Sequence, residues 1–537
     1  MISIKPRLIF VALLLCAMLG ACMQGGLLRS GDGGGGGGGS TLTMSDLQQV
    51  VNSRATITFA AVDGAANYQV SADGAGYSTI SPDPCNAGTC TYTVPNLSTG
   101  ATHNIDVRAI SGNSASAPKS IAIDTTLKVA RFVPDGIGKE DFNFGASIVS
   151  GDMNGDAYPD LAVTGLYSPA TPTTGQVDVF STGPDFIDAN RNISPAKAIS
   201  GALGSAHGAS IATGRVTGGV LGDLLIGQFK GAATEYGSIF IFTAATLDSG
   251  SSFNSDTQRD YVIDSDPAPA FAGAEFSKSI AAADMNGDGC DDIITAGPKW
   301  IDNPALFDVN KGKVYHFDGC INSNIIAGAG DEIFTGAIAF AMAGNNEWNV
   351  GDFNGDGLDE VLYLRQEVAG PPATATLGFV GGGDWGTFDQ DADTGAMAFN
   401  LGDIDGDGFG DFAVRFETLD AFFNQGGIVL IYKGPAPVVA SPAFVIFDDL
   451  QPGFGSTVAY GDIDMDGQSE IVIGSASKIS IFEGPFFDDG VDSTLPYGCS
   501  SGMIMDANAD RYLDLVCGDT LYNANGGIAE GSLLVLF

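Results

Sequence analysis

Short runs in which apolar and polar residues alternate at a period of two predict β-strands along much of the chain. Ala55–Phe59 and Tyr68–Val70 show this alternation near the N-terminus. Denser apolar runs, such as Gln176–Phe180 and Ser238–Phe242, follow further on. After the N-terminal leader, no stretch reaches the roughly 18 unbroken apolar residues typical of a transmembrane helix. The pattern therefore predicts an all-β fold.

From about residue 127, one acidic loop recurs between apolar strands. The first copy is Asp152–Asp160 (DMNGDAYPD), and a degenerate copy begins at Arg215. The other copies begin at Asp284, Asp352, Asp403, Asp462 and Asp506. The copies lie roughly 40–70 residues apart, which suits a four-stranded unit with variable loops. Each unit reads as a strand, the acidic loop, a second strand, a turn, a third strand and a less clearly marked fourth strand.

The flanks of the loops repeat as well. Phe144, Phe276 and Phe454 lie eight residues before a loop, and His207 holds this place before Arg215. A glycine often introduces the third strand, as at Gly175, Gly237 and Gly427. The last unit ends on its third strand, 531–537, whereas the strand 128–133 precedes the first unit and belongs to none. We predict that 128–133 completes the last unit and closes a ring, because an open ring would expose strand edges; the alternative is a linker strand.

These units resemble the FG-GAP repeats of the integrin α-subunit β-propeller over about residues 127–537. Phe144-Gly145 and Phe454-Gly455 carry the first half of the motif, whereas the third unit has Phe276-Ser277. Gly-Ala-Pro survives only loosely, as Ala296-Gly297-Pro298, and the phenylalanine is absent from units four, five and seven. The resemblance implies a seven-bladed β-propeller.

Residues 41–126 are long enough for one small β-sandwich before the propeller. They resemble a fibronectin type III domain at Ala66–Val70 and Leu97–Ala109, although His103 stands where that family usually has tyrosine. An unrelated small sandwich is the alternative interpretation.

The acidic loops have the composition of calcium sites. Positions 1, 3, 5 and 9 of each nonapeptide carry oxygen-bearing side chains and position 7 can offer its carbonyl, whereas calcium takes six to eight oxygen ligands. Glycine at position 6 permits the sharp turn at Gly289, Gly357, Gly408 and Gly467, and Ala157 and Arg511 replace it elsewhere. The alternative is that these are only turn residues; magnesium suits the loops less well because it demands tight octahedral geometry. We expect about six structural Ca²⁺ ions that each fix a hairpin within one blade.

The predicted ligands follow the same scheme in every loop. In blade 1 they are Asp152, Asn154, Asp156, Asp160 and the Tyr158 carbonyl; in blade 3, Asp284, Asn286, Asp288, Asp292 and the Cys290 carbonyl; in blade 4, Asp352, Asn354, Asp356, Glu360 and the Leu358 carbonyl; in blade 5, Asp403, Asp405, Asp407, Asp411 and the Phe409 carbonyl; in blade 6, Asp462, Asp464, Asp466, Glu470 and the Gln468 carbonyl; and in blade 7, Asp506, Asn508, Asp510, Asp514 and the Tyr512 carbonyl. Blade 2 keeps only Asp223, so we predict no metal there. Either Arg215 pairs with Asp223 in place of the ion, or Arg215 is exposed on a degenerate loop.

The charge balance agrees with a cation-binding protein. The 537 residues include 64 Asp and Glu but only 23 Lys and Arg, a net charge of −41 that would repel nucleic acid. The three histidines fall in different domains or blades, and they form no catalytic set with serine, cysteine or aspartate. Zinc-ligand spacing and phosphate-binding loops are also absent from the sequence.

The N-terminus is typical of an exported lipoprotein. Lys5 and Arg7 precede an apolar run that ends in Leu19–Cys22, which resembles the lipobox of bacterial lipoproteins. Residues 1–21 would then be the signal peptide, Cys22 the lipidated residue, and 22–40, with seven consecutive glycines, a tether. Met23 favours the outer membrane, by analogy with Gram-negative sorting. A general secretory signal is the alternative.

Six cysteines remain in what would be an oxidising compartment. Cys85 and Cys90 can close a small hairpin loop. Cys290, Cys320, Cys499 and Cys517 allow three pairings, of which we favour the pairs nearest in sequence.

The predicted function is non-enzymatic adhesion or ligand binding at the cell surface. Lys230, Lys299, Arg365 and Arg415, with Trp300, sit at or after the second strands of blades 2 to 5, and we expect them on the face opposite the calcium loops. There they would take an extracellular protein or an anionic glycan, unless they are scattered solubilising charges. A carbohydrate-active enzyme or its accessory subunit, such as a polysaccharide lyase or hydrolase, is the second hypothesis, and an architectural envelope component is the third. Trp348 is predicted to be a core residue.

Overall fold

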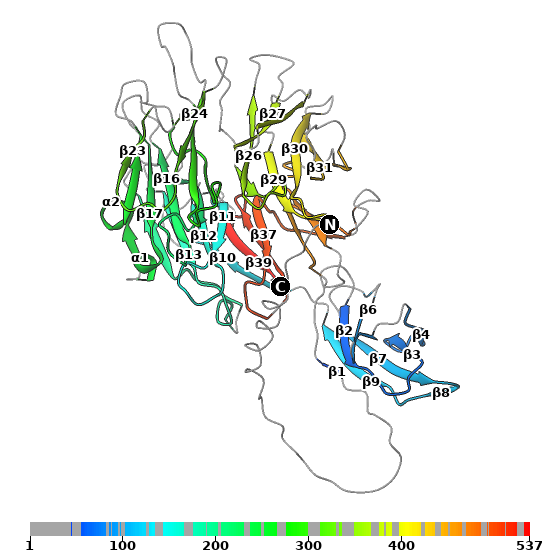
Figure 1. Ribbon diagram of the computed structural model, residues 1–537. Helices are drawn as coiled ribbons and strands as arrows, with labels where there is room; N and C mark the ends of the chain where they lie inside the picture. Colours follow the sequence, from blue (N-terminus) through cyan, green and yellow to red (C-terminus); the bar gives the residue numbers. More distant parts are fainter. Residues whose placement is uncertain are drawn as a thin grey trace, which may run out of the picture.

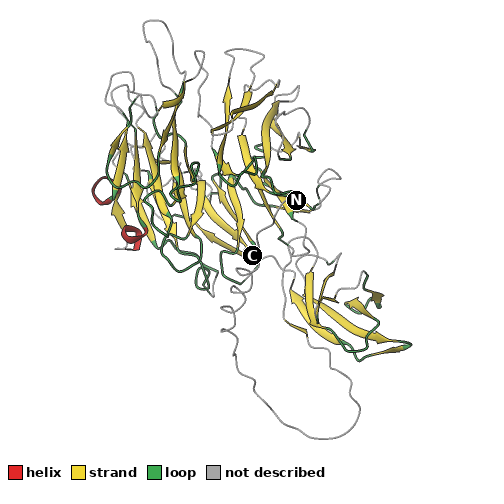
Figure 2. Ribbon diagram, in the orientation of Figure 1, coloured by secondary structure: helices red, strands yellow, loops and turns green. Residues whose placement is uncertain are grey.

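The computed structural model describes most of the chain after residue 54. The described residues are 44–45, 55–81, 85–86, 88–94, 97, 102–124, 128–134, 143–165, 175–188, 191–201, 206–229, 237–248, 252–265, 275–298, 312–328, 332–335, 348–366, 375–380, 383–388, 397–419, 425–434, 442–448, 452–463, 469–484, 491, 493–510, 512–523 and 531–537. The signal peptide, Cys22 and the glycine tether lie outside these residues. In the described part, strands predominate and only two short helices occur, α1 (Ala244–Asp248) and α2 (Ser255–Gln258) (Figure 2).

Two sheets form the N-terminal unit. The first has the order β1 (Met44–Ser45), β2 (Ala55–Ala60), β6 (Thr89–Val94), β5 (Cys85–Asn86). The second has the order β4 (Ser78–Thr79), β3 (Asn67–Ala72), β7 (Thr102–Ser111), β8 (Ser114–Ala115), with β9 (Lys119–Asp124) also paired to β7. The alternation seen in the sequence points one set of side chains, including Ile57, Phe59, Ile105 and Val107, into a single core that both sheets share. The fibronectin type III assignment remains a prediction.

Seven further sheets follow in chain order after residue 128, counted over the described residues. Blade 1 contains β11 (Phe144–Gly151), β12 (Asp160–Gly165), β13 (Gln176–Phe180) and β14 (Lys197–Ser200). Blade 2 contains β15 (Ala206–Gly214), β16 (Asp223–Phe229), β17 (Ser238–Phe242) and β19 (Tyr261–Asp264); blade 3, β20 (Ile280–Ala283), β21 (Asp292–Gly297), β22 (Lys313–Phe317) and β24 (Glu332–Thr335). Blade 4 contains β25 (Asn349–Gly351), β26 (Glu360–Gln366), β27 (Ala375–Val380) and β28 (Gly383–Phe388); blade 5, β29 (Met397–Gly402), β30 (Asp411–Leu419), β31 (Gln425–Tyr432) and β32 (Phe444–Asp448). Blade 6 contains β33 (Thr457–Gly461), β34 (Glu470–Gly474), β35 (Ile479–Phe482) and β36 (Ser493–Leu495); blade 7, β37 (Ser501–Met505), β38 (Asp514–Asp519), β39 (Ser532–Leu536) and β10 (Val129–Phe132).

In two places, a short strand from the chain segment of one blade pairs with the edge strand of the preceding blade. β18 (Ser252–Asn254), from the chain segment of blade 2, adds in parallel to β14 of blade 1. β23 (Ile325–Ile326), from the segment of blade 3, adds in parallel to β19 of blade 2. Each addition covers an otherwise exposed strand edge and links two blades.

The first strands of the seven sheets form a closed ring. Each first strand contacts the first strand of the next sheet, and β37 of blade 7 contacts β11 of blade 1. The predicted closing strand is present: β10 pairs antiparallel with β39, with Val129 opposite Leu536 (Figure 1). Arg131 of β10 also donates to Ser532 at 2.6 Å and lies 3.9 Å above the ring of Tyr522. The N- and C-terminal ends of the propeller segment are thus joined within one blade.

The repeated phenylalanine and glycine pack one blade against the next. Phe144, Phe276 and Phe454 are each at most 1 % exposed in the cores between blades. The glycine that introduces the third strand of one blade abuts the backbone at this phenylalanine in the following blade: an added Cβ would lie 2.1 Å from the Phe276 carbonyl at Gly237 and 2.3 Å from the Phe454 carbonyl at Gly427. At Gly175, where the following blade has His207 instead, the Cβ would lie 2.0 Å from the His207 carbonyl. The two signatures are therefore complementary halves of one contact.

The cysteines pair as the sequence favoured. Disulfides join Cys85 to Cys90, Cys290 to Cys320, and Cys499 to Cys517. The second links an acidic loop to the segment after the third strand of its blade. Within the described residues, no helix has the length and apolar character needed to cross a membrane.

The contact between glycine and the next blade can be tested with two matched Gly→Ala substitutions. Gly237→Ala would force a methyl group against the Phe276 carbonyl, so we expect it to lower the free energy of unfolding by about 1–3 kcal/mol or more. Gly219→Ala is the control, because its nearest neighbouring atom would be 3.8 Å away. Urea denaturation followed by fluorescence measures both. Equal stability of the two variants would contradict this packing role.

Candidate cation-binding loops and central cavity

The acidic loops of blades 1, 3, 4 and 5 share one backbone conformation, which their first residue holds. In blade 5, Asp403 accepts hydrogen bonds from the Gly406 amide at 2.7 Å and the Gly408 amide at 2.8 Å. These amides lower the pKa of Asp403, with the Gly408 amide the largest cause. Asp152, Asp284 and Asp352 make the same pair of bonds to positions 4 and 6.

The turn has left-handed backbone at two positions. Position 6 has a positive φ at Gly408 and at Ala157, where the alanine takes φ 71°. Position 4 has the same conformation, which the sequence analysis did not anticipate, as at Gly155 with φ 86° and Ala509 with φ 59°. Glycine is favoured at these places because it alone has no Cβ to clash.

Positions 3 and 5 direct their oxygens into the loop. The Asn154 side-chain oxygen accepts the Asp156 amide at 2.8 Å, and the Asp156 carboxylate accepts the Tyr158 amide at 2.9 Å. Blades 3, 4 and 7 repeat both bonds. Blade 5 repeats them with Asp405 and Asp407. At position 7 the observed group is thus the amide, and ligation by its carbonyl remains a prediction.

The carboxylate at position 9 is buried beneath each loop. Asp160, Asp292, Glu360, Asp411, Glu470 and Asp514 are all at most 4 % exposed. In five of these six loops, one oxygen accepts the amide of position 2, as from Met153 to Asp160 at 3.0 Å and from Ala507 to Asp514 at 2.9 Å. The amide two residues beyond the third strand also reaches this carboxylate, as from Gly434 to Asp411 at 2.7 Å. The residue therefore ties the loop to two strands of its blade.

Burial raises the pKa of four of these carboxyl groups. Desolvation is the main cause, and the other acids of the same loop add to it. The pKa of Asp160 and of Asp411 rises to about 6, and that of Asp514 to about 8. The pKa of Glu360 is raised for the same reasons. The negative charges thus disfavour one another when only protein groups surround them.

The arrangement fits a hard divalent cation. In blade 5, one oxygen each from Asp403, Asp405 and Asp411 lies within 4.8 Å of the others. In blade 7, the Oδ1 atom of Asp514 is buried and accepts no hydrogen bond. In blade 1, the Asn154 side chain contacts both Asp156 and Asp160, at 3.1 and 3.0 Å. The loops themselves contribute carboxylate and asparagine side-chain oxygens, the ligands that calcium takes.

The structure does not describe every predicted ligand equally. The blade 1, 3, 4, 5 and 7 loops are each folded around the residues named above. In blade 6 only Asp462 and Glu470 are described, and Asp464, Asp466 and Gln468 lie outside the described residues. Blade 5 adds a partner that the sequence analysis missed, since Lys433 Nζ lies 3.1 Å from Asp405.

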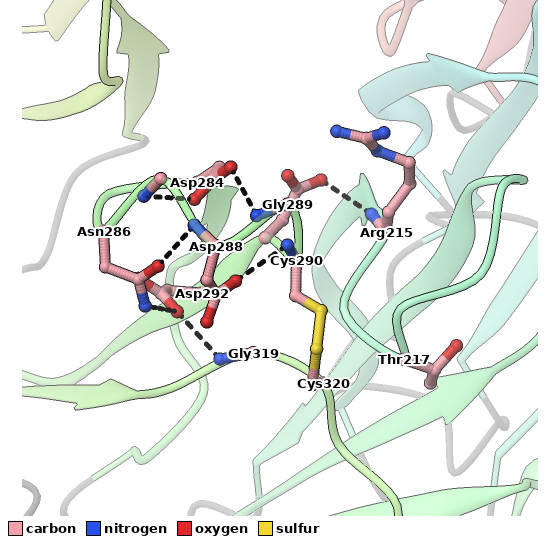
Figure 3. Close-up of a disulfide and its surroundings, with 12 residues drawn as sticks. Arg215, Thr217, Asp284, Asn286, Asp288, Gly289, Cys290, Asp292, Gly319 and Cys320 are labelled. Carbon is pink, nitrogen blue, oxygen red and sulfur yellow. Dashed lines mark hydrogen bonds between the residues drawn. A yellow bond between two sulfur atoms is a disulfide. The ribbon is translucent and has the colours of Figure 1, made fainter.

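Blade 2 replaces the cation-binding loop by hydrogen bonds. Asp223 is 2 % exposed and accepts both the amide and the hydroxyl of Thr217 at 2.8 Å. Arg215 is exposed, and its backbone amide, not its guanidinium, donates to Asp291 of blade 3 at 2.6 Å (Figure 3). The alternative in which Arg215 pairs with Asp223 is therefore wrong; the neutral hydroxyl of Thr217, at position 3 of the loop, fills that role.

The predicted basic ligand face is not supported where the structure describes it. Arg415 is 4 % exposed and donates to the Phe454 carbonyl at 3.1 Å, so its interpretation as an exposed ligand-binding residue is wrong. It packs between blades 5 and 6 instead. Lys230, Lys299 and Trp300 lie outside the described residues, and for Arg365 only the backbone, in β26, is described.

A cavity of about 420 Å³ lies at the centre of the ring. Residues at all seven first strands line it, among them Ser147, Lys278, Trp348 and Tyr460. Trp348 is half-buried and packs against the core cluster that contains Ala281 and Val361, and its indole Nε1 is buried without a hydrogen-bond partner. Because each first strand runs towards its acidic loop, the lining residues near the strand starts lie away from the loops.

The raised pKa of Asp514 predicts how stability depends on pH and calcium. In calcium-free buffer the folded protein keeps the Asp514 proton up to about pH 8, whereas the unfolded chain releases it near the ordinary pKa of 3.8. The free energy of unfolding should therefore fall as the pH rises from about 4 to about 8. Asp514→Asn should be more stable than the wild type at pH 8, similar at pH 4, and stabilised less by calcium.

Denaturation across this pH range, with and without calcium, measures the effect. Asp223→Asn is the control, since it alters the same position in the loop without predicted ligands and should leave the calcium effect unchanged. Identical pH profiles for the wild type and Asp514→Asn would contradict the role assigned to this carboxylate.

Comparisons with known proteins agree with the geometry of the repeats. The family model described as FG-GAP repeat matches residues 144–180 and 276–317, which run from Phe144 to the end of β13 and from Phe276 to the end of β22. The chain is also 24% identical over 257 residues to integrin alpha-5 of Xenopus laevis; the match covers 45% of this chain and 22% of the integrin.

A crystal structure of a DUF4784 family protein from Bacteroides caccae aligns over 86% of this chain and 99% of its own, with 9% identity. Its TM-score of 0.21 is too low to inform the fold. The two matched segments and the integrin similarity identify the chain as an all-β, integrin-like protein that carries FG-GAP repeats in a β-propeller.

Proposed function

We propose that this protein is a non-enzymatic, calcium-dependent ligand-binding module of the adhesion type. The observation that carries the proposal is the set of buried position 9 carboxylates, which in blades 1, 4, 5 and 7 lie near further acids of the same loop. An integrin-like propeller is a scaffold suited to binding, and the similarity to integrin alpha-5 supports the assignment by analogy.

Calcium would act on the structure of each blade. When bound, the ion supplies the positive charge that the buried carboxylates lack. Position 9 already holds the position 2 amide and, in blade 5, the Gly434 amide after the third strand. Neutralising this carboxylate would stabilise the hairpin between the first two strands, so the shape of the ring would depend on the calcium concentration. Extracellular calcium modules bind at roughly 10⁻⁴–10⁻³ M.

The central cavity is the place where we propose that the ligand docks. Its lining combines serine and threonine side chains with Lys278 and Trp348, which suits a polar ligand such as a glycan or an acidic loop of an extracellular protein. Its lining reaches Tyr460 and Ile504, each two residues before an acidic loop, so calcium would support the site through the strands that carry these residues.

The N-terminal segment suggests how the module is held at the membrane. We propose that Cys22 is lipidated and that the glycine tether lets the module stand off the outer membrane. The similarity to an integrin favours an extracellular or surface location.

Binding arrays of glycans and extracellular proteins, run with millimolar calcium and with chelator, test the proposal. We expect ligands that bind only with calcium. Trp348→Ala should weaken binding at least tenfold, whereas Trp348→Phe, which keeps a ring but lacks the N–H, should weaken it less. Conversion of a polysaccharide into products would favour the carbohydrate-active enzyme instead, and binding unaffected by both calcium and Trp348→Ala would contradict the proposal.

A further inference from the structure

Blade 3 has a histidine where five of the other six blades have a buried aliphatic residue; blade 4 has Phe379 at this place. His316 in β22 lies opposite Ile294, which is two residues after the position 9 carboxylate Asp292. The equivalent aliphatic residues are Val179, Ile241, Ile431, Ile481 and Val535, and all are at most 5 % exposed. An imidazole here is a specific feature of this blade and not part of the repeat.

His316 faces two carboxylates. Its Nε2 atom lies 3.3 Å from Asp292 Oδ2 and 3.9 Å from Asp318 Oδ1. One ligand atom from each of the three residues lies within 4.8 Å of the others. Ligand atoms about 2.1 Å from a tetrahedral ion lie about 3.4 Å apart, so the cluster needs little rearrangement to hold one ion.

The buried atoms of this cluster have no hydrogen-bond partner. The Asp292 side chain is 0% exposed, and neither its Oδ2 atom nor His316 Nε2 makes a hydrogen bond. The other oxygen, Oδ1, accepts the Gly319 amide at 2.7 Å and the Asn286 amide group at 3.4 Å. In the other five acidic loops, the second oxygen of position 9 accepts the amide of position 2, but here the Met285 amide donates to the Ala283 carbonyl. Asp292 Oδ2 is thus directed at the imidazole.

A disulfide holds the two halves of the cluster together. Cys290, two residues before Asp292, is bonded to Cys320, two residues after Asp318 (Figure 3). Ile321 also donates to the Val216 carbonyl of blade 2 at 2.8 Å, which fixes the following segment. The ligand-bearing segments are therefore positioned before any ion binds, and a preorganised site binds more tightly.

We propose that Asp292, His316 and Asp318 bind a transition-metal ion of the zinc type, with water completing its coordination. An imidazole nitrogen with two carboxylate oxygens suits zinc, nickel or copper better than calcium, which takes oxygen ligands. The exposed Asp318, at 84% of its side-chain surface, leaves the ion a route from solvent. Because Asp292 is also a predicted calcium ligand, the two ions would compete in blade 3 alone, and the other loops would stay calcium sites.

Zinc titration of the untagged full chain, stripped of metal and followed by calorimetry, tests the proposal. We expect one zinc site that is weakened at least tenfold in His316→Gln and in Asp318→Asn, and unchanged in His103→Gln, which alters a histidine of the N-terminal unit. Asp318→Asn changes an exposed side chain, so its loss of zinc affinity would not reflect misfolding. Anomalous scattering at the zinc edge in crystals should place the ion between these residues.

Two outcomes would overturn the site. Zinc affinity that is equal in the wild type and in both variants would show that the ion binds elsewhere. Absence of zinc binding, together with lower stability of metal-free His316→Gln, would show that His316 only pairs with Asp292. Calcium stabilisation of the other blades should persist in either case, so this test is independent of the proposed calcium-dependent function.

Discussion

The buried carboxylate at position 9 of each acidic loop is the constraint on which the propeller depends. It begins the second strand of its blade, accepts the amide of position 2 in five of the six acidic loops, and lies beneath two or three further acids. Burial raises the free energy cost of the charged carboxylate. The neighbouring negative charges increase this cost, as the raised pKa of Asp514 shows. A cation offsets this cost, and blade 2 reduces it by removing the acids at positions 1, 3 and 5 and giving Asp223 two bonds from Thr217.

Apolar packing between blades is the second requirement, and one contact accounts for two features of the repeat. The phenylalanine of each such blade packs in the core between that blade and the preceding one. The glycine before the third strand of the preceding blade lets the two backbones come into contact. At the ring's junction, the same contact joins Gly531 of blade 7 to Phe144 of blade 1, where an added Cβ would lie 2.2 Å from the Phe144 carbonyl. Pairing of β10 with β39 places the closing strand in the same blade. The ring is therefore closed by the same contact that joins the other blades and by the pairing of β10 with the last blade.

Much of the fold could be predicted because its signals are local and repeated. The alternation of apolar and polar residues predicted the strands, and the nonapeptides predicted the loops. The unpaired strand at each end of the repeat region predicted the pairing of 128–133 with 531–537. The disulfides also followed from separation in sequence, because each closes a short segment within one unit.

The errors concern individual side-chain contacts, which a repeat pattern does not encode. Arg415 lies on a strand whose sequence looks amphipathic, but its side chain is buried and donates a hydrogen bond to the Phe454 carbonyl of the next blade. Arg215 has the charge to pair with Asp223, yet Thr217 is nearer along the loop. His316 was passed over because no sequence motif surrounds it. Aligning the third strands of the blades would have shown a lone histidine among apolar residues.

The most direct measurement of the central claim is the number of calcium ions that the protein binds. Equilibrium dialysis of the full chain at millimolar calcium should find about six ions per molecule. The variant with Asp160, Asp411 and Asp514 all changed to asparagine should bind about three fewer ions, provided that circular dichroism shows it folded. A wild-type protein that binds no calcium under these conditions would contradict the account.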